Sequence, residues 1–247
     1  MSTIDSRQGV SPASLLAQVP PEMHFQAAPG VWPMVLDMLP SPCRVLDIGA
    51  GRGGLSWILH KCGFDVTPID LHPEHFLAPG MTCTAANAQE AIPFPDQTFD
   101  RIVTVEVIEH LENPWNFLRE CLRVLRDDGQ LILTSPNVVT LMSRLTFLLR
   151  GTLPYFREES FVGCYHVTPI FPWIVDRACR TGGGKIVETR FSRVDWPRRN
   201  DIPYRLSRVR SRALSLLPKN RLTGEIVAYR IRKDPARSRV TPGLHYK

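Results

Sequence analysis

A glycine-rich turn with acidic residues on either side is the part of this chain best suited to hold a ligand. The turn reads Leu46-Asp-Ile-Gly-Ala-Gly-Arg-Gly-Gly54 and separates a predicted strand from a predicted helix. Glycines permit a tight bend and let a ligand approach bare backbone amides. The spacing satisfies both G-x-G-x-x-G and G-x-G-x-G, so the glycines alone leave a dinucleotide site, another nucleoside site and a purely structural turn open.

Two carboxylates narrow the choice of ligand. Asp47 lies two residues before Gly49, where its charge would repel a pyrophosphate and attract an ammonium group. Asp70 ends the next predicted strand, where a carboxylate accepts hydrogen bonds from a ribose diol. A nucleoside that carries a cationic amino-acid tail satisfies both conditions. S-adenosylmethionine (SAM) is such a molecule, and we expect it as the cofactor.

A second chemical cluster follows the fourth predicted strand and reads Glu106-Val-Ile-Glu109-His110. On a helical turn Glu106 and Glu109 would share a face, with His110 close by. Carboxylates with an imidazole suit Mg²⁺ or Mn²⁺. The histidine could also act as a base near neutral pH, or have only a structural role. The residues themselves leave these three interpretations open.

The elements that must position these residues alternate between strands and helices. Strands are predicted at 44–48, 64–69, 81–85, 99–105, 130–134, 185–191 and 225–232, and helices at 13–18, 31–39, 55–62, 113–126, 138–150 and 171–180. Such alternation is typical of a parallel sheet covered on both faces. We therefore predict an α/β fold with a Rossmann-like, seven-stranded, mostly parallel sheet, helices on both faces and a helical lid insertion.

The chain resembles class I SAM-dependent methyltransferases over residues 43–137. The motifs that carry the resemblance occur in the family's order: Val45–Gly53, Val66–Asp70, Asn87–Gln89, Pro93–Asp100 and Leu125–Thr134. The resemblance implies a set of cofactor-binding residues: Asp47, Gly49, Ala50, Gly51 and Gly53 at the methionine part, Asp70 and Leu71 at the ribose, Asn87 and Ala88 at the adenine, and Glu106. Many relatives have Asp where this chain has Asn87, whose carbonyl can still accept a hydrogen bond from the adenine amine.

The E-x-x-E-H segment resembles that of ubiquinone-biosynthesis O-methyltransferases and small-RNA 2′-O-methyltransferases, in which a divalent ion lies near the acceptor hydroxyl. The resemblance implies a metal set of Glu106, Glu109, His110 and His166, the last from Tyr165-His-Val-Thr-Pro169. In metal-free methyltransferases with the same segment, the histidine faces the substrate. His110, Glu109 and His166 are therefore the predicted catalytic residues, with Mg²⁺ or Mn²⁺ as a further expected cofactor.

Composition and charge limit the class of protein and the compartment in which we expect it. The chain has 247 residues, 43% of them apolar, and a net charge of +6. Residues 185–247 carry 17 Lys and Arg against 5 Asp and Glu, so the rest of the chain is acidic. The six cysteines form no C-x-x-C pair, which argues against a zinc ribbon or redox dithiol. No apolar run is long enough for a transmembrane helix, and the N-terminal residues lack the basic and apolar regions of a secretion signal, so we expect a cytoplasmic protein.

The basic quarter suits an anionic partner. Residues 204–217 have an amphipathic helical pattern that would either lie on the inner face of an anionic membrane or pack against the domain. Nucleic acid is the weaker alternative, because aromatic residues are few here.

We expect an N-terminal arm and cap helix over 1–40, a methyltransferase domain over 41–233 and a tail over 234–247. The domain would contain a lid insertion at 138–168 and a basic insertion at 193–222. Segments within Ser135–Ile170 resemble bacterial methyltransferases of cell-surface polysaccharide and lipid-linked sugar synthesis. O-methylation of a small-molecule, sugar or lipid-linked acceptor is the expected function. The alternatives are a metal-dependent RNA 2′-O-methyltransferase, a SAM-binding subunit without activity, and an NAD-dependent oxidoreductase, which Asp47 and the lack of a second nucleotide-binding half oppose.

Overall fold

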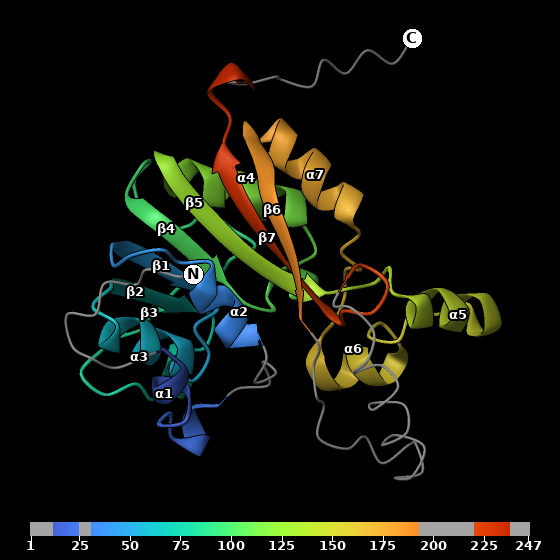
Figure 1. Cartoon of the computed structure of the whole chain (residues 1–247), viewed down its shortest axis with the longest axis horizontal. Coiled ribbons are helices and arrows are strands. Elements are labelled where there is room, and N and C mark those ends of the chain that lie inside the picture. Colours follow the sequence, from blue (N-terminus) through green and yellow to red (C-terminus); the bar gives the residue numbers. More distant parts are fainter. Residues whose placement is uncertain (1–11, 25–30, 193–219, 238–247) are drawn as a thin grey trace.

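Seven strands form one sheet in the order β3-β2-β1-β4-β5-β7-β6 in a computed structural model of the chain (Figure 1). The strands are β1 Arg44–Ile48, β2 Asp65–Asp70, β3 Thr84–Ala85, β4 Phe99–Thr104, β5 Leu125–Pro136, β6 Gly184–Ser192 and β7 Ile226–Lys233. Strands β1 to β5 pair in parallel, and β7 is antiparallel to both β5 and β6. The predicted Rossmann-like, mostly parallel sheet is confirmed.

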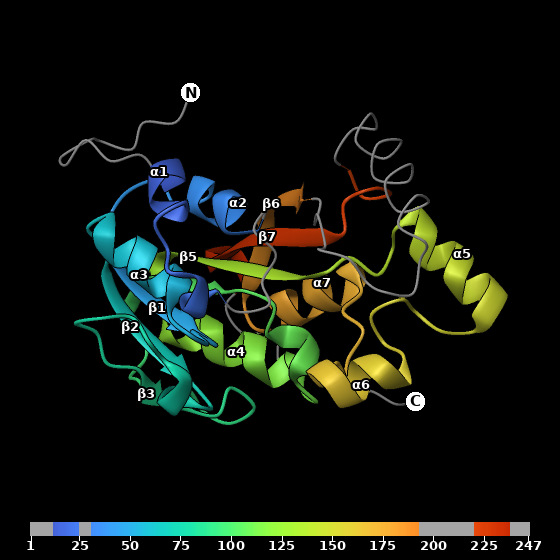
Figure 2. The ribbon, with the colours of Figure 1, turned by 90° about the horizontal axis from the view of Figure 1, so that it is seen from below.

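Helices cover both faces of this sheet. The helices that do so are α1 Pro12–Leu16, α2 Val31–Asp37, α3 Gly54–Lys61, α4 Pro114–Val124 and α7 Pro172–Thr181, whereas α5 Leu141–Arg150 and α6 Glu158–Cys164 lie in the insertion at 138–168. One buried cluster joins α1, α2 and α3 to one face, and a second joins α4 and α7 to the other. Figure 2 shows these two layers on opposite sides of the strands. The cores hold the sheet rigid, so the loops at the carboxyl ends of its strands are set in fixed positions.

The structure describes residues 12–24, 31–192 and 220–237. The amphipathic pattern predicted at 204–217, most of the basic insertion, most of the tail and parts of the N-terminal arm lie outside these ranges. Within them, no helix has the length and apolar character that spanning a bilayer requires.

Three predicted elements differ from the structure. The helix expected to reach residue 126 ends at Val124, because Leu125 takes an extended conformation and pairs with Phe99. Pairing then jumps to Arg101 and Gln130, so β5 starts earlier than the predicted strand 130–134 and contains a bulge. The strand predicted at 81–85 is only Thr84–Ala85. The lid insertion, for which a helix is predicted only at 138–150, also contains the short helix α6.

Candidate active site

The glycine turn after β1 has a backbone that only glycine adopts easily. Gly49, Gly51 and Gly53 have φ values of +74°, +54° and +84°. The amides of Gly49 and Ala50 donate to the carbonyl of Ile69 at 2.9 and 3.1 Å, which ties the turn to β2. A Cβ atom at Gly49 would lie 2.3 Å from Cγ2 of Val107. The turn therefore packs directly against the Glu106–His110 segment that follows β4.

A pocket opens beside this turn, and residues far away in the sequence complete it. Its lining residues come from the turn, α3, the end of β4 and the N-terminal segment: Met23, Trp32, Asp47, Gly49, Ala50, Gly51, Gly54, Leu55 and Val105. A Cβ atom at Gly54 would lie 2.4 Å from the Trp32 ring and 2.7 Å from the Met23 carbonyl. Met23 and Trp32 were not predicted as site residues, and the one feature that marks them in the sequence is that they are apolar within a polar, proline-rich segment.

Asp47 forms the charged wall of the pocket. Its side chain is 2% exposed, and one carboxylate oxygen accepts a hydrogen bond from the Ser56 hydroxyl at 2.5 Å. Burial raises the pKa of Asp47 to about 7, the hydrogen bond from Ser56 lowers it, and the nearby charge of Asp70 raises it. A cation in the pocket would favour the ionised form. Ser56, like Met23 and Trp32, was not predicted from the sequence.

The residues predicted at the ribose and adenine lie at the neighbouring strand ends, outside the lining of this pocket. Asp70 accepts hydrogen bonds from the amides of Gly51 and His72, each at 2.8 Å. Leu71 follows it and is exposed. The Asn87 carbonyl accepts from the Gln89 amide at 3.1 Å, and Ala88 packs against the core. Gly53 is likewise not in the lining, because it lies against Phe76 and Ala78.

Glu106 is held by two hydrogen bonds with the side chain of Thr134. The Glu106 amide donates to the Thr134 hydroxyl at 3.0 Å, and that hydroxyl donates to a Glu106 carboxylate oxygen at 2.8 Å. Glu106 also has a left-handed backbone, with φ +56°. Burial raises the pKa of its carboxyl group.

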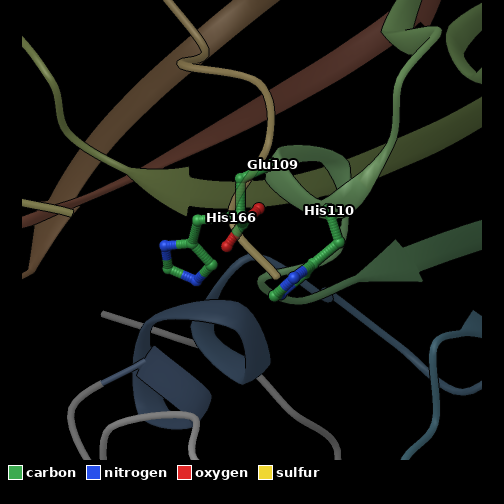
Figure 3. Close-up of side chains that lie close together, drawn as sticks. All are labelled: Glu109, His110 and His166. Carbon is green, nitrogen blue, oxygen red and sulfur yellow. The ribbon is translucent and has the colours of Figure 1, made fainter. Parts of the chain in front are cut away.

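Glu109, His110 and His166 converge on one point, as Figure 3 shows. Each offers a potential ligand atom, and these atoms all lie within 4.8 Å of one another. The Glu109 side chain is fully buried, and neither carboxylate oxygen has a hydrogen-bond partner. Burial, and then the charge of Glu106, raise the pKa of Glu109 well above its usual value. Three of the four predicted metal ligands therefore meet, and Glu106 is not in the group.

Backbone carbonyls of the lid orient both imidazoles. Nδ1 of His110 lies 3.1 Å from the Tyr165 carbonyl, and Nδ1 of His166 lies 2.9 Å from the Tyr155 carbonyl. A carbonyl only accepts, so each Nδ1 donates, and in the neutral form of each ring Nε2 carries the lone pair. Histidines that bind metals are usually held in this way. A buried carboxylate without a partner and two imidazole lone pairs fit a divalent cation.

Comparison with known sequences identifies the central part of the chain. Residues 46–133 match a family described as a methyltransferase domain. The chain is 37% identical over 110 residues to a 2-methyl-6-phytyl-1,4-hydroquinone methyltransferase of Synechocystis, a match that covers 41% of this chain and 35% of that protein. It is 32% identical over 107 residues to a ubiquinone biosynthesis O-methyltransferase of Xanthomonas axonopodis, covering 40% and 45%. The matches thus span less than half the length of either relative.

Solved structures share the fold over almost the whole chain. A SAM-dependent methyltransferase from Archaeoglobus fulgidus superposes with a TM-score of 0.57 at 18% identity, covering 93% of this chain and 97% of that one. A possible histamine N-methyltransferase from Thermotoga maritima gives 0.56 at 16% identity, covering 89% and 92%. At these identities the likeness concerns the fold alone.

Proposed function

Residues 46–133 belong to the class I SAM-dependent methyltransferases, and on that premise we propose that the protein methylates an oxygen atom of a small-molecule, sugar or lipid-linked acceptor. The observation that carries the proposal is the cluster of Glu109, His110 and His166 beside the glycine turn. Methyl transfer is an in-line displacement that needs alignment, and a hydroxyl acceptor must also lose its proton. The names of two relatives, a hydroquinone methyltransferase and a ubiquinone biosynthesis O-methyltransferase, support a small-molecule acceptor.

Residues of the pocket and of the neighbouring strand end would hold different parts of the methyl donor. Asp47 offers a buried negative charge to the ammonium group of SAM. The bare amides of the glycine turn allow the methionine part to approach closely. Asp70, whose oxygens already order the backbone at Gly51 and His72, retains lone pairs for the ribose hydroxyls.

The histidines supply the proton acceptor. Burial lowers the pKa of His110 from its usual value, so its ring is neutral near pH 7. A neutral imidazole with Nδ1 bound to a carbonyl presents Nε2 as a base. His166 stands next to it, with the two ring centroids 4.8 Å apart. We assign proton removal to His110 and the orientation of the acceptor to His166.

As the alternative to a histidine base, Glu109, His110 and His166 would hold Mg²⁺ or Mn²⁺, and Nε2 of His110 would then bind the ion and not take the proton. When bound there, the ion would lower the pKa of the acceptor hydroxyl. The fully buried, unpartnered carboxylate of Glu109 supports this assignment, because an isolated buried charge is costly without a counter-ion. Glu106 is better placed as a neighbour of the donor than as a ligand, since Thr134 already engages it.

Mn²⁺ binding tests the metal assignment independently of turnover. Electron paramagnetic resonance should show one Mn²⁺ bound to the wild-type protein, and Glu109→Gln should weaken that binding at least tenfold. Glu112→Gln is the matched control, because Glu112 is an exposed carboxylate on the same segment. Equal Mn²⁺ affinity in wild type and Glu109→Gln would refute the site. Circular dichroism establishes that each variant is folded.

Turnover tests the role of His110. Transfer of a tritiated methyl group from SAM should label a lipid, polysaccharide or small-molecule fraction of a cell extract. His110→Ala should reduce that labelling by a factor of about 10²–10⁴, the usual worth of a general base. The affinity for S-adenosylhomocysteine, measured by calorimetry, should stay unchanged. Retained labelling would refute the base, and labelling confined to RNA would replace the acceptor class with a nucleic acid.

A further inference from the structure

Helix α5 has its apolar face turned toward solvent. At helical spacing Leu141, Met142, Leu145, Leu148 and Leu149 form one stripe, and these side chains are between 40% and 79% exposed. The buried member of the helix is Ser143, on the opposite side. Surface helices of globular proteins normally bury such a stripe, so an exposed one indicates an interaction surface. Figures 1 and 2 both show α5 standing at one end of the molecule, away from the sheet.

The helix is anchored without using that stripe. The Thr140 side chain accepts a hydrogen bond from the Ser143 amide at 3.0 Å, which caps the first turn. Gly151 ends the helix in a left-handed conformation, with φ +69°. The Leu141 amide donates to the Leu222 carbonyl at 2.9 Å. The apolar face is thus presented by a preformed helix and is not required to hold it in place.

The charges around the stripe have one sign. Arg144 and Arg150 flank it on its two sides, and both are exposed. Residues 138–150 contain two arginines and no acidic residue. Arg221, also exposed, adjoins the start of the helix through Leu222. An apolar helix face bordered by arginines is the pattern of a helix that lies in the interface of an anionic bilayer.

We propose that α5 docks on an anionic lipid surface, with the leucine stripe in the headgroup boundary and the arginines at the phosphates. A helix of 10 residues is about 15 Å long, half of the ~30 Å core of a bilayer, so α5 lies along the surface. Two copies packed stripe to stripe would bring the flanking arginines of both together, which disfavours self-association. Arginine stems can follow the stripe while their charged heads stay at the headgroups.

The docking helix belongs to the same insertion that orients the two histidines. Its continuation supplies the Tyr155 and Tyr165 carbonyls that hold His166 and His110. Docking would therefore bring the membrane surface to the side of the molecule that carries the acceptor site.

Vesicle flotation of the full-length protein tests the proposal. The protein should float with vesicles of phosphatidylglycerol and phosphatidylcholine, and much less with phosphatidylcholine alone. The double variant Leu145→Glu, Leu148→Glu should bind at least tenfold more weakly. Val187→Glu is the matched control, because Val187 is an apolar side chain of similar exposure, 44%, on β6. Arg144→Gln with Arg150→Gln should reduce the preference for the anionic lipid.

Three results would overturn it. The first is wild-type protein that stays at the bottom of the gradient with both vesicle types. The second is flotation that the double variant retains, which would move the contact to another part of the chain. The third is a wild-type dimer by sedimentation that the double variant dissolves, without flotation, which would make a second copy the occupant. Calorimetric affinity for S-adenosylhomocysteine should be equal in wild type and double variant, which establishes that the variant is folded.

Discussion

The buried carboxyl group of Asp47 makes the affinity for a positively charged ligand depend on pH. The residue type and its place before the first glycine predicted an acidic wall. The sequence could not predict the hydrogen bond from Ser56, because that contact forms only when α3 packs beneath the turn. Nor could it predict that Glu109 would lack any partner, since that follows from how the lid closes over the segment after β4. His166, by contrast, was predicted from a family resemblance and does meet Glu109 and His110.

The affinity for the donor should rise with pH because of Asp47. Its pKa of about 7 in the free protein means that it is largely protonated at about pH 6 and ionised at about pH 8. A bound ammonium group favours the ionised form, so S-adenosylhomocysteine should bind more tightly over that interval and release a proton as it binds. Calorimetry in buffers of different ionisation enthalpy measures both effects.

Asp47→Asn should remove that pH dependence and weaken binding at about pH 8 by a factor of ~10–100, the worth of a charged hydrogen bond. Ser56→Ala serves as the comparison, because it leaves the carboxylate but removes a contact that lowers its pKa. The midpoint of its pH profile should therefore move upward. An Asp47→Asn protein with the wild-type affinity and pH profile would contradict this role.

At the scale of elements, the sheet was predictable and its short connections were not. The long periodic segments identified all seven strands, with errors confined mainly to their ends. Helix α6 was missed, because 7 residues are too few for a helical period to stand out. The start of β5 was assigned to a helix because Leu125 continues the apolar spacing of α4, whereas pairing with Phe99 extends the chain there.

Because the glycine turn packs against Val107, we expect alanine substitutions at two glycines to differ in their effect on the free energy of unfolding. Gly49 and Gly80 have nearly the same φ, +74° and +75°, but only Gly49 lacks space for a Cβ atom. Gly80→Ala should cost only the left-handed strain, about 1–2 kcal/mol in the free energy of unfolding. Gly49→Ala should cost more and should also weaken binding of S-adenosylhomocysteine, because the turn must shift away from Val107.

Urea denaturation and calorimetry measure the two quantities. Adding Val107→Ala to Gly49→Ala should recover part of the lost stability, since it removes the methyl group that the new Cβ meets. Equal losses in the free energy of unfolding for Gly49→Ala and Gly80→Ala would mean that the turn does not pack against Val107.

At the scale of the whole molecule, the pocket joins parts of the chain that no local pattern connects. Met23 and Trp32 reach the glycine turn from the N-terminal segment, and contacts of this kind depend on the completed fold. The lid joins the same region from the other side through Tyr155 and Tyr165. Donor pocket, histidines and α5 thus occupy connected parts of one structure, although the sequence presents them as separate motifs.

Calorimetric titration of the protein with S-adenosylhomocysteine, and separately with NAD, tests whether the glycine turn and its acidic residues hold SAM. We expect saturable binding of one S-adenosylhomocysteine per chain, weakened in Asp47→Asn, and no binding of NAD. Binding of NAD by a protein that ignores S-adenosylhomocysteine would contradict it.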